Sequence, residues 1–311
     1  MTDNGLLFEG TEKRLEFSFS TSTTCSKGMR NISYQTWSCL LVKAKCSILH
    51  SITNEMVDAY LLSESSLFVY PFSVILKTCG TTIPLTIVSD IIDLANSLNL
   101  PINYLKYSHC PYKFTQLQPP LYQSFQSEIK QLASIISPQT KTLILGSEQW
   151  FIYYLIWQAD QFKPLLEISL VDLNPSSMKY FCLPSQFTSP LDCATQLGLT
   201  HLHGLTSDHL IVDPFQFDPC GFSLNAIIND IYYTIHITPE LNCSFVSFES
   251  NVDPSVYQLL IHQIITIFQP NHFTILSSSL NDLSLTNYQL LTNINQDLLT
   301  LRSYQKSSLS Y

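Results

Sequence analysis

The stretch that decides the fold runs from Asp58 to Thr82 and reads DAYLLSESSLFVYPFSVILKTCGTT. It holds three short apolar segments, at 58–62, 66–70 and 73–78, which are separated by polar or turn-forming residues. Apolar segments of this length between turn signals are typical of β-strands. The stretch therefore predicts three short strands that follow one another closely in sequence.

A group of short strands followed by a helix appears in each half of the chain. Helical periodicity over 89–98 follows the first group of strands. In the second half, strands at 232–238 and 244–249 are joined by the short 239–243 connection as a plausible hairpin, and a helix at 254–268 follows them. Strands followed by a helix in both halves indicate an α+β layered protein. A duplicated unit is possible, but the two halves share too little sequence to show one.

Two further segments complete the expected elements. Residues 15–20 alternate polar and apolar side chains as a strand does, and apolar residues recur at helical spacing within 124–136.

His201 and His203 show no metal-ligand spacing with nearby acids, so we expect no metal site.

The charge of the chain argues against several classes of partner. The 311 residues carry a formal net charge of -9 and include only 8 glycines. After Lys163, the only lysines and arginines are Lys179, Arg302 and Lys306. Such a surface repels phosphate backbones, so we expect no nucleic-acid binding. Neither GxGxxG nor GxxxxGK[ST] occurs, so a phosphate-binding loop is not expected either.

Cysteine usage and the chain's apolar stretches point to the cytosol. Nine cysteines without a CxxC pair are expected to be free thiols that serve as small core residues in a reducing compartment. The N-terminus carries Asp3, Glu9 and Glu12 and lacks the apolar region of a secretory signal. The most apolar stretch, at 150–157, is too short to span a bilayer, so we expect no membrane partner.

The segment Leu62–Ser66, LSESS, lies between two predicted strands and allows two interpretations. One is a polar hairpin turn. The other is self-cleavage, in which the Ser65 hydroxyl attacks the Glu64 carbonyl to form an ester. β-Elimination and hydrolysis then leave a pyruvoyl group, whose ketone can form a Schiff base with a substrate amine. By themselves these five residues favour the turn.

Three more side chains are candidates for chemistry. Cys79 ends a predicted strand, where its thiol is either a proton donor or nucleophile, or a buried structural residue. His236 shares a strand face with Thr234 and Thr238, which suits a general base but equally a structural histidine. Glu240 lies just past the end of that strand, where a carboxylate can reach ligand hydroxyls.

In two places an aromatic residue precedes polar side chains, which are carboxylates in the first place and a hydroxyl in the second. Phe8 is followed by Glu9 and Glu12, and Phe217 precedes Ser223. Two aromatic rings can hold a planar base between them, and carboxylates can face a cation. The alternative is a core aromatic residue beside solvated charges.

These segments together resemble eukaryotic-type S-adenosylmethionine decarboxylase. The resemblance rests on segments in the family's order: FEGTEKRLE at 8–16, LLSESSLFV at 61–69, ILKTCGTT at 75–82, FDPCGFS at 217–223, and YTIHITPE at 233–240 followed by SFVSFES at 244–250. The regions 100–205 and 255–311 match only weakly.

The resemblance implies a role for each matching residue. The proenzyme would cleave itself between Glu64 and Ser65, and Ser65 would become the pyruvoyl cofactor. His236 would be the processing base, Ser223 would assist processing at the scissile carbonyl, and Cys79 would be the proton donor. The remaining assignments are the activity or processing acids Glu9 and Glu12, the adenine-stacking Phe8 and Phe217, the ribose-binding Glu240, and Glu64 as a further substrate contact.

The resemblance also raises the question of activation by putrescine, which binds an acidic pocket in some members. Glu16, Glu167 and Glu249 match acids of that pocket, whereas Lys163 and Leu165 depart from it. A buried group of carboxylates needs a countercharge. We expect Lys163 to supply it and putrescine activation to be absent. Asp218 is a second departure, since the family usually has Asn after the stacking Phe.

By resemblance, the fold would be a four-layer αββα sandwich with two face-to-face antiparallel sheets and helices outside. Residues 1–311 would form a single decarboxylase domain, cleaved into a β chain, 1–64, and an α chain, 65–311. The product would be the decarboxylated aminopropyl donor for spermidine and spermine, and the protein would be a monomer or homodimer. The alternative is a catalytically dead regulatory paralogue that binds and activates an active subunit, but such paralogues lose residues that are present here.

Overall fold

The computed structural model describes residues 8–22, 25–136, 141–147, 149–158, 163–278, 283, 285, 288–296 and 299–307. The chain divides into two compact units. The first unit consists of residues 11–161, and the second consists of residues 1–10 and 162–311. Each unit is described by itself below.

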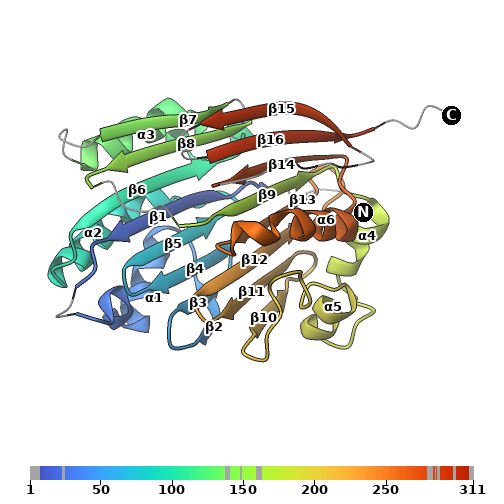
Figure 1. Ribbon diagram of the computed structural model, residues 1–311, viewed down its shortest axis with the longest axis horizontal. Helices are drawn as coiled ribbons and strands as arrows, with labels where there is room; N and C mark the ends of the chain where they lie inside the picture. The colour runs from blue at the N-terminus through green and yellow to red at the C-terminus, as the bar shows by residue number, and fades with distance from the viewer. Residues whose placement is uncertain are drawn as a thin grey trace. The chain divides into compact units, whose positions relative to one another are not determined.

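The described part of the first unit has one eight-stranded antiparallel sheet, in the order β2-β3-β4-β5-β1-β6-β8-β7 (Figure 1). Its strands are β1 (Lys13–Phe19), β2 (Ile48–Thr53), β3 (Asp58–Leu62), β4 (Ser65–Tyr70), β5 (Ser73–Thr78), β6 (Ile102–His109), β7 (Lys141–Ser147) and β8 (Trp150–Ile156). Its helices are α1 (Tyr34–Lys43), α2 (Val88–Ser97) and α3 (Phe125–Ile135), with short 3₁₀ turns η1 (Gly28–Asn31), η2 (Pro84–Ile87), η3 (Thr115–Leu117) and η4 (Pro120–Gln123).

Strand alternation divides the side chains of this sheet between its two faces. In β1, Leu15 and Phe17 join the apolar cluster that contains Trp37 of α1 and Ile91 of α2. Arg14, Glu16 and Ser18 alternate with them and therefore lie on the other face. The helices thus cover the apolar face, and the polar residues of β1 are placed on the opposite one.

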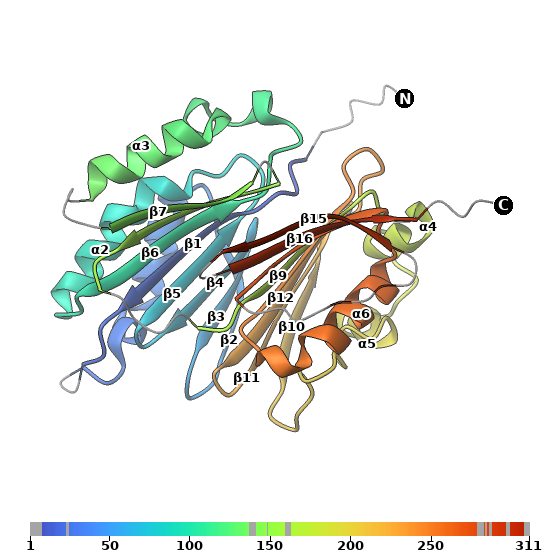
Figure 2. The ribbon, with the colours of Figure 1, turned by 45° about the horizontal axis from the view of Figure 1, so that its top comes forward.

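The described part of the second unit repeats this arrangement, with the sheet order β10-β11-β12-β13-β9-β14-β16-β15 (Figure 2). Its strands are β9 (Leu166–Val171), β10 (Ile211–Gln216), β11 (Phe222–Ile228), β12 (Ile231–Thr238), β13 (Phe245–Ser250), β14 (His272–Ser277), β15 (Tyr288–Gln296) and β16 (Leu299–Lys306). Its helices are α4 (Pro175–Met178), α5 (Pro190–Gln196) and α6 (Tyr257–Phe268), with 3₁₀ turns η5 (Lys179–Phe181) and η6 (Pro254–Val256).

The two strand orders are the same when each strand of the first unit is matched with the strand eight places later. Strand β1 thus corresponds to β9, β4 to β12 and β5 to β13. This correspondence supports the duplication that the sequence left open, because two unrelated sheets have no reason to share an eight-strand order.

The expected elements agree with the structure to within a few residues. The strands at 58–62 and 73–78 are β3 and β5 with the predicted bounds. The predicted helices at 89–98, 124–136 and 254–268 correspond to α2, to α3, and to η6 with α6. Pro254 starts the last of these, where the Asp253 side chain accepts a hydrogen bond from the backbone N–H of Ser255.

Candidate active site

The predicted cleavage site is a hairpin turn. Strand β3 ends at Leu62, β4 begins at Ser65, and the pairing of these two residues leaves Ser63 and Glu64 as the turn. The turn interpretation of LSESS is therefore correct as local structure. Ser65 has a φ of 134°, a region that side-chain-bearing residues rarely occupy. Strained backbone of this kind is often found at functional sites, and here it lies directly after the predicted scissile bond.

The carbonyl oxygen of Glu64 accepts two hydrogen bonds from Cys79. The backbone N–H of Cys79 donates at 2.8 Å and its thiol donates at 3.2 Å. The sheet register explains the approach, because Ser65 pairs with Thr78 and thereby brings the end of β5 beside the turn. Both donors point at the atom that would carry negative charge if the Glu64 carbonyl were attacked.

Burial keeps the Cys79 thiol protonated. It raises the pKa of Cys79 well above its ordinary value, and the nearby carboxylates of Glu12 and Glu64 raise it further. The Lys13 ammonium opposes this shift but does not outweigh it. A neutral thiol can both donate a hydrogen bond and deliver a proton, as the predicted role of Cys79 requires.

The hydroxyl of Ser65 donates a hydrogen bond to Oε1 of Glu12. The other carboxylate oxygen of Glu12 lies 2.9 Å from Nζ of Lys77. The side chains of Lys77 and Glu12 are only 3% and 6% exposed, and Ser65 is 2% exposed. Glu12 therefore joins a buried cation to the hydroxyl that the sequence analysis predicts to be the nucleophile.

The sequence analysis overlooked Lys13, which holds the turn after Cys79. Its Nζ donates to the carbonyl of Gly80 at 2.9 Å and lies 5.0 and 5.2 Å from the ring centroids of Tyr112 and Tyr122. The side chain is fully buried. The available signal was weak, because Lys13 lies two residues before the predicted strand at 15–20 and lysines are usually exposed.

In the second unit, Ser223 and His236 face each other on neighbouring strands. They are register partners on β11 and β12, and the Ser223 hydroxyl lies 2.7 Å from Nδ1 of His236. The Thr234 hydroxyl lies 2.7 Å from Nε2. As predicted, His236 is on the polar strand face, while Tyr233 and Ile235 belong to the apolar cluster. The imidazole is thus held by a hydroxyl at each nitrogen.

Phe217 and Phe8 both belong to the second unit. Phe217 is partly exposed and packs edge-on against Phe215, with 4.7 Å between ring centroids. Phe8 is 36% exposed. Both rings have accessible surface for a ligand, and stacking of a base between them remains a prediction.

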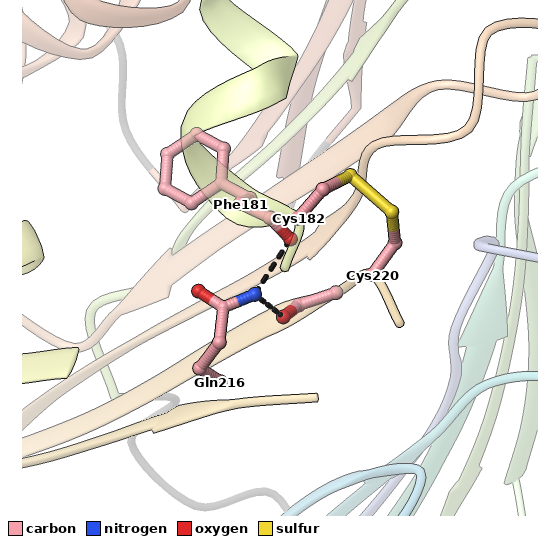
Figure 3. The surroundings of a disulfide bond; sticks show 5 residues. Phe181, Cys182, Gln216 and Cys220 are labelled. Atoms are coloured by element: carbon pink, nitrogen blue, oxygen red, sulfur yellow. Dashed lines mark hydrogen bonds between the residues drawn. A yellow bond between two sulfur atoms is a disulfide. The ribbon is translucent and has the colours of Figure 1, made fainter. Parts of the chain in front are cut away.

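The loop that carries Phe217 is held by a disulfide between Cys182 and Cys220 (Figure 3). The expectation of free thiols throughout is therefore wrong for this pair. Cys182 follows η5 and forms an isolated β-bridge with Cys220, a proximity that sequence spacing could not indicate. The Gln216 amide also fastens the loop, donating to the carbonyls of Phe181 and Gly221 at 2.7 and 2.9 Å.

Glu240 and Glu9, two of the predicted acids of the second unit, are placed differently. Glu240 is partly buried, and within the described part of the chain its Oε2 atom is buried without a hydrogen-bond partner. Glu9 is buried at 4% exposure and makes an interaction of its own, and its role in activity or processing remains a prediction.

The countercharge expected from Lys163 comes from other residues at Glu16. Nη1 of Arg14 lies 2.7 Å from Oε2 of Glu16, and the hydroxyl of Tyr104 donates to Oε1 at 2.5 Å. Burial alone would raise the pKa of Glu16, but Arg14, Lys106 and the hydrogen bond from Tyr104 together outweigh it and lower the pKa. Lys163 is exposed. At Glu16 the cations are therefore Arg14 and Lys106, and a countercharge from Lys163 to the rest of the predicted pocket remains a prediction.

Glu167 and Glu249, the other two acids of the predicted pocket, are register partners on β9 and β13. Both are buried, and the hydroxyl of Tyr232 donates to Glu249. Leu165 is also buried, just before β9.

Within the described ranges, no group of three or more His, Cys, Asp or Glu side chains could hold a metal ion. No helix there is long and apolar enough to cross a membrane.

The chain is similar to known proteins over most of its length. The family profile described as adenosylmethionine decarboxylase matches residues 6–310. The S-adenosylmethionine decarboxylase proenzyme of Drosophila melanogaster is 37% identical over 298 residues, covering 88% of this chain and 84% of the relative. That of Dictyostelium discoideum is 32% identical over 282 residues, covering 86% and 73%.

A solved structure shows the same fold. The Trypanosoma brucei AdoMetDC-delta26 monomer aligns with a TM-score of 0.63 and 25% identity, covering 78% of this chain and 99% of that one. This likeness confirms the predicted fold class. Because the profile and the relatives both extend over most of the sequence, the chain belongs to the adenosylmethionine decarboxylase family.

Proposed function

We propose that this chain is a proenzyme that cleaves its own Glu64–Ser65 bond and then decarboxylates S-adenosylmethionine. The product would be the aminopropyl donor for spermidine and spermine. The observation that carries the proposal is the pair of contacts at that bond. The Ser65 hydroxyl lies against the Glu12 carboxylate, and the Glu64 carbonyl accepts both hydrogen bonds from Cys79.

The first unit is suited to form and use a pyruvoyl group at position 65. Such a group supplies a ketone that condenses with the substrate amine and takes up the electron pair released with carbon dioxide. Ser65 is buried, so the position is shielded from competing water. The protonated Cys79 thiol lies 3.2 Å from the adjoining carbonyl oxygen, close enough to return a proton to the substrate carbon.

His236 is proposed to remove the α-proton of residue 65 during β-elimination. Its imidazole has a hydroxyl at each ring nitrogen, which holds the ring in one orientation. Ser223, which contacts Nδ1, is proposed to assist processing. The conversion of Ser65 then proceeds through an ester, elimination to dehydroalanine, and hydrolysis that releases ammonia.

Three side chains of the second unit are proposed to bind the substrate. The accessible rings of Phe8 and Phe217 suit a flat adenine. The carboxylate of Glu240, just past the end of β12, suits the ribose hydroxyls as a hydrogen-bond acceptor. The sulfonium charge of the substrate would be favoured by aromatic faces.

The proposal is tested on the purified full chain. Intact mass spectrometry should show fragments 1–64 and 65–311, the second blocked at its N-terminus. Carboxyl-labelled S-adenosylmethionine should then release labelled carbon dioxide. A chain that stays intact would contradict the proposal, and a chain that cleaves but releases no carbon dioxide would instead be an inactive regulatory paralogue or a ligand-binding protein.

A further inference from the structure

We propose that Glu12 is the catalytic base of the first processing step, and that the backbone of Ser65 is already set for the ring closure which that step requires. This inference rests on the proposed self-cleavage at Glu64–Ser65. It assigns a chemical role to Glu12 and a function to the unusual conformation of Ser65. All the residues that carry it belong to the first unit.

The conformation of Ser65 is the first observation. In the acyl shift, Oγ of Ser65 attacks the Glu64 carbonyl carbon and closes a ring of that carbon, N, Cα, Cβ and Oγ. Ring closure requires Cβ to lie on the same side of the N–Cα bond as the carbonyl carbon. Viewed along the N–Cα bond, Cβ of an L-residue is rotated by roughly 120° from the carbonyl carbon of the same residue. A φ near 120° therefore aligns Cβ with the carbonyl carbon of the preceding residue.

The φ of Ser65, 134°, is close to this arrangement. The same crowding of Cβ against the preceding carbonyl makes the region unfavourable for most residues. The fold therefore imposes at Ser65 a strained conformation that resembles the cyclic intermediate. Pairing of Ser65 with both Leu62 and Thr78 holds the residue there.

The second observation is the contact between the Ser65 hydroxyl and Glu12. A serine hydroxyl is a weak nucleophile until a base takes its proton. The Ser65 hydroxyl donates a hydrogen bond to Oε1 of Glu12. Nζ of Lys77 lies 2.9 Å from Oε2 of the same carboxylate. The hydroxyl is therefore already positioned for proton transfer, and Lys77 fixes the carboxylate that receives the proton.

The third observation is that Cys79 lies beside the carbonyl oxygen on which negative charge would develop. As Oγ bonds to the Glu64 carbon, the carbonyl π pair moves to oxygen, where the N–H and thiol of Cys79 donate hydrogen bonds. When the oxygen re-forms its double bond, the C–N bond breaks and the nitrogen takes the proton held by Glu12. The product is an ester with a free amine, with the same atoms as the starting peptide.

The main test compares Glu12→Gln with the wild-type chain during processing. Hydroxylamine cleaves an ester but not a peptide, so it distinguishes a chain stopped before the shift from one stopped after it. We expect Glu12→Gln to slow the shift by about 100-fold or more, leaving an intact chain that hydroxylamine does not cut. Hydroxylamine cleavage at Glu64–Ser65, or processing within about threefold of wild type, would overturn the assignment.

Two further variants separate chemistry from folding. Asp58→Asn removes another paired carboxylate of the first unit, which contacts Arg30 at the far end of β3, and should process at the wild-type rate. Glu12→Asp keeps the charge opposite Lys77 but withdraws the carboxylate from Ser65, and should slow the shift about 10-fold or more. An unchanged rate in Glu12→Asp would overturn the proposal even if Glu12→Gln failed to fold.

A thiol nucleophile provides a readout that a structural role would not change. The lower pKa of cysteine makes it less dependent on a base than serine. In a Ser65→Cys background, Glu12→Gln should therefore slow formation of the hydroxylamine-sensitive thioester by less than about 10-fold. An equal loss in both backgrounds would mean that Glu12 only supports the fold. If wild-type protein does not cleave at all, the proposed function itself fails.

Discussion

The β3–β4 hairpin of the first unit and the β11–β12 hairpin of the second occupy equivalent positions in two sheets of the same strand order. Both have two-residue turns, because Leu62 pairs with Ser65 and Ile228 pairs with Ile231. In the second hairpin the positive φ, 51°, falls on Asn229, a residue type that tolerates it. In the first it falls on Ser65, at 134°, where a side chain is strained.

This difference indicates that a two-residue hairpin turn alone would not account for the proposed cleavage. Both turns reverse the chain, but the first places its strain at a serine whose hydroxyl meets Glu12 and whose preceding carbonyl meets Cys79. The second unit carries its processing candidates, Ser223 and His236, on the strands and not at the turn. The duplicated framework thus supplies equivalent positions, and different side chains give them different chemistry.

The largest expected effect comes from removing the Ser65 hydroxyl from the first hairpin. Ser65→Ala removes the hydroxyl, so no ester can form and no pyruvoyl group can arise. We expect one uncut chain by intact mass spectrometry and no carbon dioxide release. Ser66→Ala, at the neighbouring buried serine on β4, is the matched control and should still cleave at Glu64–Ser65. Cleavage of Ser65→Ala would place the reaction elsewhere.

The next largest effect separates the steps carried by the two units. His236→Ala should allow the acyl shift but slow β-elimination by about 10² to 10⁴, the range for loss of a general base. The uncut chain should then be cleaved by hydroxylamine, in contrast with Glu12→Gln. Thr234→Ser keeps a hydroxyl beside Nε2 and is the control for local packing. An uncut His236→Ala chain that resists hydroxylamine would place His236 before the ester.

A smaller effect tests the buried acids on the equivalent strands β1 and β9. Glu16 on β1 is paired with Arg14, whereas Glu167 on β9 has Glu249 as its register partner. We expect putrescine to leave wild-type processing unchanged, because Arg14 and Lys106 already lower the pKa of Glu16. Arg14→Leu should slow processing about 10-fold, and added putrescine should restore part of the rate.

The Arg14–Glu16 ion pair predicts a pH dependence of stability. The folded-state pKa of Glu16 lies below its ordinary value of 4.5, so the pair stabilises the protein above that pH and loses its contribution as the pH falls through the folded-state pKa. Chemical denaturation between pH 6 and pH 3 should therefore show a steeper loss of unfolding free energy for wild type than for Glu16→Gln. Parallel curves would argue against the Arg14–Glu16 pair.

The smallest expected effect concerns the disulfide of the second unit. Cys220→Ser should raise KM for S-adenosylmethionine a few-fold, about 1 kcal/mol or less, because the loop with Phe217 is still held by Gln216. Cleavage should be unchanged, because the pairing of β11 with β12 holds Ser223 and His236 together without the disulfide and so separates the processing residues from the loop. Cys193→Ser, at a buried free thiol of the same unit, is the control. A slower cleavage of Cys220→Ser would contradict this separation.

The sequence by itself determined the local features of this protein. Alternation and turn residues identified β3 and β5 with their bounds, and periodicity identified α2, α3 and α6, because these signals depend on neighbouring residues. The motifs that resemble the family identified Ser65, Cys79, Ser223 and His236. The face of β12 that carries His236 also followed from alternation alone.

Only the tertiary structure decided which residues meet. The contacts of Glu12 with Ser65, of Lys13 with Gly80 and of Cys182 with Cys220 join residues far apart in the chain. The cations at Glu16 are Arg14 and Lys106 and not Lys163, because the pairing of β1 with β6 brings Lys106 opposite Glu16. Register and crossover connections set such contacts, and both depend on the packing of the whole sheet, which no local pattern encodes.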